Sequence, residues 1–197
     1  MKKGLIIGLA VVAVIVIWAI STYNGLVKEQ QKVEESWAQV ENVYQRRADL
    51  IPNLVQTVKG YAKHEKETLE GVVQARANAT SVKIDASNLD EASLKKFQAA
   101  QGELGSALSK LLAVREAYPD LKANENFRDL QAQLEGTENR ITVERRNFNE
   151  VARNYNTAVR TFPKNIFAGM FGFQKEPMYE IAASERAAVE AAPKISF

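Results

Sequence analysis

The sequence predicts an all-α protein in which an N-terminal transmembrane helix is followed by an up-and-down antiparallel four-helix bundle. Three observations predict this fold: a charge-free apolar run at the N-terminus, apolar residues that recur every three and four positions, and the composition. Ala, Glu, Lys, Leu and Arg supply 87 of the 197 residues, with only 5 Pro and 10 Gly. Such a bias is typical of long helices and argues against a β-sandwich.

Charge and reactive side chains exclude several classes of function. Lys2 and Lys3 account for the whole net charge of +2, so we expect no nucleic-acid partner. The chain has no Cys, which excludes disulfides and thiolate sites. The single His64 has Tyr61 three residues before it and Thr68 four residues after it, so it matches neither a di-iron nor a zinc-protease motif. We interpret it as an exposed side chain and expect no metal, no cofactor, no catalytic residue and no enzymatic activity.

Residues 1–27 are predicted to form the membrane anchor. The stretch 4–27 carries no charge and 4–20 is apolar throughout, close to the roughly 20 residues that a spanning helix needs. Trp18 and Tyr23 lie at its far end, where amphipathic rings favour the lipid–water boundary. A cleaved signal peptide is the alternative, because a weak small-x-small cleavage site follows the run. The length of the run and the uninterrupted helical periodicity after it favour a retained anchor.

The residues that flank the anchor predict its orientation. Two lysines precede the span and two follow soon after it, but proximity and the α-amino group favour an inside N-terminus. We therefore expect a cell-membrane protein whose soluble domain lies outside the cytoplasm. Gly4 and Gly8 form a GxxxG pattern that lets two spanning helices approach closely. The alternative is that small residues are simply common in membrane helices.

The periodicity after the anchor predicts four helices of similar length, over residues 24–48, 50–82, 88–118 and 124–162. Each presents one apolar face that must be buried. The last is the clearest, because nine of its eleven stripe positions are apolar. Matched lengths and short loops are typical of an up-and-down bundle, which we place in residues 28–173.

The breaks between these helices carry their own signals. Asn88 with Glu91 fits a capping box, and Asn124 fits the N-cap of the last helix. Pro119 and Pro163 disfavour helix at the residues before them and so end the third and fourth helices.

Pro52 allows two interpretations. Arg46 and Arg47 suit a helix C-terminus and Asp49 suits an N-cap, so that one helix would end and the next begin there. Against this, the heptad phase runs unbroken through Pro52, as a kinked continuous helix would require.

Charged and polar residues on or near the predicted apolar stripes form a second candidate site. A charge on a core stripe is costly unless it is paired, so we interpret these residues as a polar network that fixes helix register. A ligand or partner site is an alternative, and so is a stripe that ends early and leaves them in solvent. The residues are Arg46, Arg47, Asp49, Glu138, Asn139, Arg140 and Glu144.

An apolar segment follows the fourth helix. In an up-and-down bundle that helix returns toward the membrane, so we expect the segment to contact lipid or a neighbouring subunit. The alternative is that it folds back and closes the end of the core. Its large side chains are Ile166, Phe167, Met170, Phe171 and Phe173. The tail, residues 174–197, is either flexible or holds a short helix over 179–191.

Several stretches resemble the LemA family. They are RRADLIPNL at 46–54, TVKGYA at 57–62, EAYPDLKAN at 116–124, LEGTENR at 134–140, and Tyr155-Asn156 leading to Phe162-Pro163. The resemblance covers about residues 23–173 and includes the N-terminal span. It implies a membrane-anchored four-helix bundle, two separate helices around Pro52, and no established activity or catalytic residue. It also implies a short N-terminus outside the cell, opposite to the orientation that the flanking charges favour.

Together these features predict a non-enzymatic single-pass protein in contact with the lipid bilayer. We expect a helical scaffold that forms a homo-oligomer or holds another membrane protein. The alternative is an envelope sensor or regulator whose bundle binds a ligand or an adjacent membrane enzyme such as a protease.

Overall fold

The computed structural model describes residues 2–180, and every regular element in this range is helical. The all-α prediction is confirmed. Two 3₁₀ turns, η1 (Ala86–Asn88) and η2 (Val114–Ala117), connect the longer elements. The α-helices are α1 (Lys2–Tyr61), α2 (Lys66–Ser81), α3 (Glu91–Ala113), α4 (Pro119–Ala123), α5 (Glu125–Arg160) and α6 (Lys164–Phe171).

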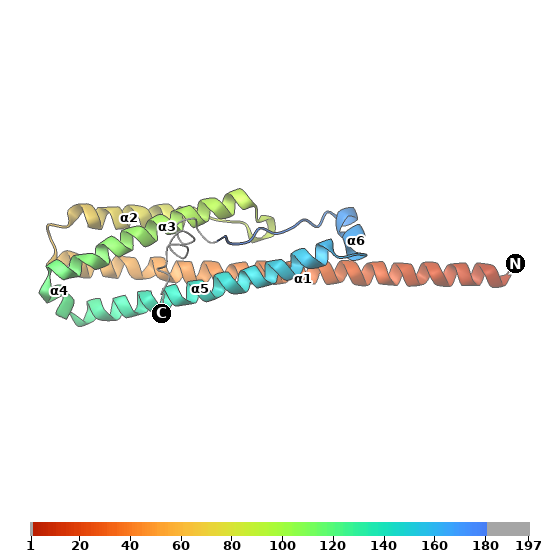
Figure 1. The fold of residues 1–197 in the computed structure, drawn as a ribbon, viewed down its shortest axis with the longest axis horizontal. Coiled ribbons are helices and arrows are strands. Elements are labelled where there is room, and N and C mark those ends of the chain that lie inside the picture. The colour runs from red at the N-terminus through yellow and green to blue at the C-terminus, as the bar shows by residue number, and fades with distance from the viewer. Residues whose placement is uncertain (1, 181–197) are drawn as a thin grey trace, which may run out of the picture.

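Helix α1 is the axis of the molecule. Its N-terminal part extends alone past α6, while the other elements lie along its C-terminal part (Figure 1). The first side chain that the fold buries is Thr22. Within the described residues, α1 is the one helix long and apolar enough to cross a membrane, and its apolar stretch is entirely unburied. The predicted apolar helix is therefore present.

The remaining long helices alternate in direction along α1. The chain runs away from the N-terminal end in α1, returns in α2, reverses again in α3 and returns in α5 (Figure 1). The closest packing is between α1 and α5 and between α2 and α3, and α1 also contacts α2. Helix α6 closes the series by packing on both α1 and α5.

The predicted stripes fill the core. Trp37, Leu104 and Phe148 lie on them and are fully buried. Two of the predicted stripe positions are exposed instead: Tyr61 is the last residue of α1, and Phe162 follows the end of α5. The core consists of two apolar clusters, one along the middle of α1 and one around its C-terminal turns.

Of the two interpretations of Pro52, the division that the family resemblance implies is wrong, because α1 continues to Tyr61 and the break falls at residues 62–65. Pro52 is exposed, whereas Ile51 and Leu54 on either side are fully buried. The burial of this apolar face favours one continuous helix and outweighs the hydrogen bond that proline removes.

The carbonyl oxygen that Pro52 leaves without a helical donor belongs to Ala48, four residues earlier. Arg76 of α2 donates from its Nε to this oxygen at 2.7 Å. A side chain from the neighbouring helix thus replaces the missing backbone N–H. This is the physical reason that the helix survives a proline in its interior.

The N-cap of α5 is the residue that the sequence predicts, whereas the N-cap of α3 is a different one. Asn124 caps α5 as predicted, because its Oδ1 accepts from the Phe127 N–H at 2.9 Å. The predicted capping box at Asn88 is wrong. Helix α3 is instead capped by Asp90, whose Oδ1 accepts from the Ser93 N–H at 2.8 Å.

The predicted third helix, 88–118, is too long at both ends. Helix α3 covers only Glu91–Ala113, and η2 and α4 follow it. Pro119 opens α4 at its first position, where proline lacks no helical hydrogen bond.

Candidate functional site

Arg47 is the centre of the first candidate site. It is 4% exposed and lies on α1 between the two apolar clusters. Its Nη1 donates to Glu138 Oε2 of α5 at 3.0 Å, and its Nη2 donates to Gln101 Oε1 of α3 at 2.6 Å. The Nη2 also reaches the Gln101 carbonyl oxygen at 3.1 Å. The guanidinium lies 5.0 Å from the Tyr44 ring centroid. One side chain therefore ties three helices together.

Gln101 extends this contact to a fourth helix. It is buried, and its Nε2 donates to the carbonyl oxygen of Ala79 on α2 at 3.4 Å. Thr137 of α5 is buried at the same level and donates to Gln133 O of its own helix. We call Arg47, Gln101, Thr137 and Glu138 the polar layer. Helices α1, α3 and α5 contribute apolar core residues on both sides of the polar layer, whereas α2 contributes them to one cluster only.

The other charged residues predicted for this network do not join it. Arg46, Asn139 and Arg140 are exposed. Asp49 is also exposed and accepts from Gln45 on its own helix. Glu144 is half-buried, and its Oε2 accepts from Asn147 at 3.2 Å. Of the predicted residues, the described structure brings only Arg47 and Glu138 together. Gln101 and Thr137 were missed, although their polar side chains interrupt the predicted stripes of their helices.

The second candidate site joins the predicted anchor to the predicted apolar segment. Trp18 packs edge-on against Phe167 with ring centroids 4.9 Å apart. Tyr23 meets Phe171 at 5.0 Å and Phe173 at 5.6 Å. We call these five residues the aromatic cluster. It holds α6 against α1 where the apolar stretch of α1 ends.

Helix α6 turns one face inward and one outward. Ala168 is buried and Phe173 packs against the adjacent core cluster. Ile166, Met170 and Phe171 are 52%, 72% and 51% exposed. The segment therefore makes core contacts and also presents an apolar surface beside the apolar part of α1. Gly4 and Gly8 lie on that part of α1, with open space where a Cβ would stand.

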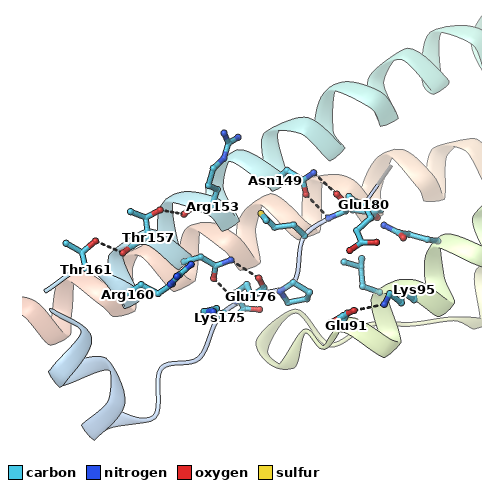
Figure 2. Close-up of a pocket in the computed structure, with 16 residues that line it drawn as sticks. Glu91, Lys95, Asn149, Arg153, Thr157, Arg160, Thr161, Lys175, Glu176 and Glu180 are labelled. Carbon is cyan, nitrogen blue, oxygen red and sulfur yellow. Dashed lines mark hydrogen bonds and ion pairs between the residues drawn. The ribbon is translucent and has the colours of Figure 1, made fainter. Parts of the chain in front are cut away.

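A third site was not predicted. Residues 174–180 form no helix and run extended along α5. Asn156 of α5 donates to the Glu176 carbonyl oxygen and accepts from the Glu176 N–H, both at 2.8 Å. Asn149 does the same for Tyr179, at 2.9 and 2.7 Å. Figure 2 shows these paired bonds. A short helix over 179–191 is one of two alternatives for the tail; residues 179 and 180 are not helical, and the positions from 181 onward lie outside the described residues.

Tyr179 anchors this extended segment in the core. The side chain is 6% exposed and stacks on Trp37 at 6.1 Å between centroids. Phe148 meets its ring edge-on at 5.8 Å, and the Arg145 guanidinium lies over it at 4.8 Å. Burial raises the pKa of Tyr179 well above its ordinary value, so the phenol is neutral at physiological pH.

A cavity of about 910 Å³ lies beside the extended segment, between α3 and α5. Its wall carries Lys95, Arg153 and Arg160 as well as Glu176 (Figure 2). Burial, with a smaller effect from Glu34, raises the pKa of Glu176 to about 7. The cavity is therefore lined by mixed charge around one carboxyl group that titrates near neutrality.

None of these sites has the side chains of a metal centre. Within residues 2–180, no group of three or more His, Asp or Glu side chains is placed to hold a metal ion. His64 is exposed in the short connection between α1 and α2. What the three sites have in common is contact between segments that lie far apart in the sequence.

Comparison with known proteins gives a consistent family match. A sequence model described as the LemA family matches residues 36–197. The chain is 24% identical over 167 residues to Protein LemA of Metamycoplasma hominis, covering 85% of this chain and 70% of that protein. It is 26% identical over 170 residues to the magnetosome protein MamQ of Magnetospirillum gryphiswaldense, covering 78% of this chain and 62% of the relative. Magnetosome protein MamQ 2 of Paramagnetospirillum magneticum is 25% identical over 175 residues, 80% of this chain. The chain spans less than two thirds of each MamQ protein.

Proposed function

Because the chain belongs to the LemA family, we propose that it is a non-enzymatic, single-pass membrane scaffold that assembles with copies of itself. The observation that carries this proposal is the aromatic cluster. It fixes α6, with its outward apolar face, beside the apolar stretch of α1.

The outward face of α6 supports a role at the membrane. Ile166, Met170 and Phe171 would remain in contact with water if the body stood free in solution. Large apolar side chains gathered in one place mark a surface that lipid or another protein covers. Trp18 and Tyr23 supply the amphipathic rings that favour the lipid–water boundary, so α6 would lie at that boundary.

The polar layer supports a fixed architecture. An ionic group inside an apolar core contributes little net stability, because desolvation offsets the attraction. Its best-attested use is to select one register among the many that apolar stripes allow. In this proposal α1, α2, α3 and α5 close as an up-and-down four-helix bundle whose register Arg47 sets. A body of defined shape is what a scaffold requires.

The proposed orientation places the helical body outside the cytoplasm, following the lysines before the span. Single cysteines test it, since the chain has none of its own. Glu67 is exposed, so a membrane-impermeant maleimide applied to intact cells should label the E67C variant. Labelling only after lysis would show that the helical body lies inside the cytoplasm, opposite to the proposed orientation.

Particle mass tests assembly. Native mass spectrometry of the full chain in mild detergent should give a discrete oligomer. The same measurement on residues 28–197 reports whether the span or the body drives association. A monomer for the full chain over the micromolar range would contradict self-assembly.

A second candidate is a sensor or regulator of the envelope. The cavity beside residues 174–180 favours it, because a charged cavity next to a titrating carboxyl group would accommodate a ligand. A ligand that binds the folded state raises the unfolding temperature, and the rise grows with the logarithm of its concentration over its Kd. A thermal-shift screen that finds no stabilising compound or partner would count against this candidate.

A further inference from the structure

The extended segment 174–180 is bound to α5 as a peptide ligand is bound. Asn149 and Asn156 each pair with both the N–H and the carbonyl of one backbone residue. These hydrogen bonds are made to backbone groups and not to side chains. They can therefore hold any extended chain that presents its N–H and carbonyl groups at the right spacing. We call the surface formed by Asn149, Asn156 and the pocket of Tyr179 the docking groove.

The spacing of the two asparagines suits an extended chain. They lie seven residues apart on α5, which corresponds to about 10.5 Å of helix rise. The residues they pair with, Glu176 and Tyr179, lie three apart, and an extended chain covers about 10 Å in three residues. Two turns of helix therefore match three residues of extended chain. Asn149 and Asn156, which we call the two clamps, can both pair with the segment without strain in either backbone.

One side chain gives the contact its specificity. Tyr179 is buried against Trp37 and Phe148, whereas Met178 next to it is 44% exposed. An anchor in a pocket combined with main-chain bonds is the usual arrangement in peptide recognition. A helix packed into the core would instead bury a continuous stripe.

The segment does not fill the groove that it occupies. The cavity of about 910 Å³ remains beside it, and Gln98 on its wall has a buried Nε2 with no hydrogen-bond partner among the described residues. Glu176 lies near Glu34 of α1, which carries the same charge. The chain before the segment turns at Gly172, which has φ +78° and open space around it. A glycine can change this turn without steric cost.

We infer that the docking groove is an exchange site, in which residues 174–180 of a neighbouring copy bind in place of the chain's own segment. The inference rests on the proposed self-assembly, and it specifies which residues of two copies are in contact. A second copy carries the same backbone spacing and the same tyrosine, so every bond of the intramolecular contact is available between chains. Exchange of identical elements is a low-cost route to assembly. Anchoring in one membrane raises the effective concentration of the neighbouring segment.

Cysteine cross-linking in the full chain tests this inference against a background free of native cysteine. Arg153 and Met178 both line the cavity, and the R153C/M178C double variant tests whether the pair can close within one chain. The decisive sample co-expresses R153C and M178C on two chains of different tagged size. We expect a disulfide between chains, above the level of either single variant alone.

Variants of the clamp show whether that product forms in the groove. N149A/N156A in the R153C chain removes four hydrogen bonds and should lower the interchain product on the order of tenfold. N154A is the matched control, because Asn154 is exposed on the same helix between the two clamps. It should leave the product unchanged. Strong cross-linking within the double variant, with no interchain product above the N149A/N156A background, would overturn the exchange.

A complementation test does not depend on cysteine geometry. Y179A copies keep an intact groove, and N149A/N156A copies keep an intact segment. Exchange predicts that differently tagged copies of these two variants co-purify with each other more than either variant does with itself. Equal recovery in all three pairings would overturn the inference. Particle mass distinguishes failure of the exchange from failure of self-assembly. An oligomer that shows no exchange would overturn only the exchange, whereas a monomer would contradict self-assembly as well.

Discussion

Arg76 lies within 2.7 Å of the carbonyl oxygen that Pro52 deprives of its helical hydrogen bond. The two residues come from different helices, α2 and α1, and they are related through Ala48, whose oxygen is the one left free. The break that Pro52 would otherwise cause is repaired by tertiary structure. This relationship explains how a 60-residue helix holds a proline in its interior.

A double-mutant cycle measures this relationship. R76A should lower the free energy of unfolding by about 1–3 kcal/mol, because it leaves a half-buried carbonyl without a donor. The P52A variant regains a backbone N–H that can pair with the Ala48 carbonyl oxygen, so R76A should cost less in that background. Denaturant unfolding of the four full-length proteins gives the coupling energy. R146A is the control, since Arg146 is exposed. Equal costs in both backgrounds would show that the two residues act independently.

The polar layer makes a second prediction. E138A leaves the buried Arg47 guanidinium with only neutral acceptors on Gln101. Glu138 is itself 57% exposed at its side chain, so solvent can replace part of the lost interaction. We expect a loss of about 1–3 kcal/mol in unfolding free energy. N139A, at the exposed neighbouring position, should change it by less than about 0.5 kcal/mol. Equal unfolding free energies for E138A and N139A would show that Glu138 has no structural role.

The outward face of α6 makes a third prediction. I166S/M170S changes two exposed side chains and should leave the unfolding temperature of the body unchanged. It should reduce either lipid association or particle mass, because the proposed cover of that face is lost. N165S on the same helix is the control. A large fall in unfolding temperature would mean that these side chains belong to the core and would contradict the membrane-boundary role.

Glu176 makes a prediction about pH. Its pKa is raised from 4.5 to about 7 in the docked segment, so the docked state binds a proton that the released segment gives up. Docking is therefore favoured at low pH and weakens as pH rises from about 4.5 through 7. Limited proteolysis of the tail should accelerate across this window. E176Q removes the titration and should give a flat, slow rate, whereas a pH dependence that persists in E176Q would assign it to another group.

Sequence reasoning found the elements whose signal is local and periodic. The stripe through Trp37, Val40 and Tyr44 and the cap at Asn124 depend on residues near in sequence, and the structure confirms them. The residues around Pro52 left both interpretations open, because the donor that replaces the missing N–H comes from Arg76, on the next helix. The family resemblance pointed to two helices there, whereas the unbroken phase of the stripe indicated the helix that forms.

The sites were only partly accessible from the sequence. Arg47 was found because a charge interrupts an apolar stripe, and Gln101 and Thr137 carry the same signal in weaker form. Tyr179 lies in a stretch with no periodicity, and its pocket is made by Trp37 and Phe148, from two helices far apart in the sequence. Asn149 and Asn156 pair with backbone, which leaves no trace in side-chain patterning. Such contacts follow from the tertiary fold alone.

The unbroken course of α1 has a mechanical consequence. At about 1.5 Å per residue the helix is a rod of about 90 Å, and the apolar end and Arg47 lie on the same rod with no joint between them. A tilt or axial rotation imposed on the apolar end by bilayer thickness or by a neighbouring helix is therefore carried directly to the level of Arg47. There it would move the guanidinium relative to its acceptors on α3 and α5. In the proposed membrane setting, lateral pressure in the bilayer would thus act on the helix register of the body through the rotation angle of α1.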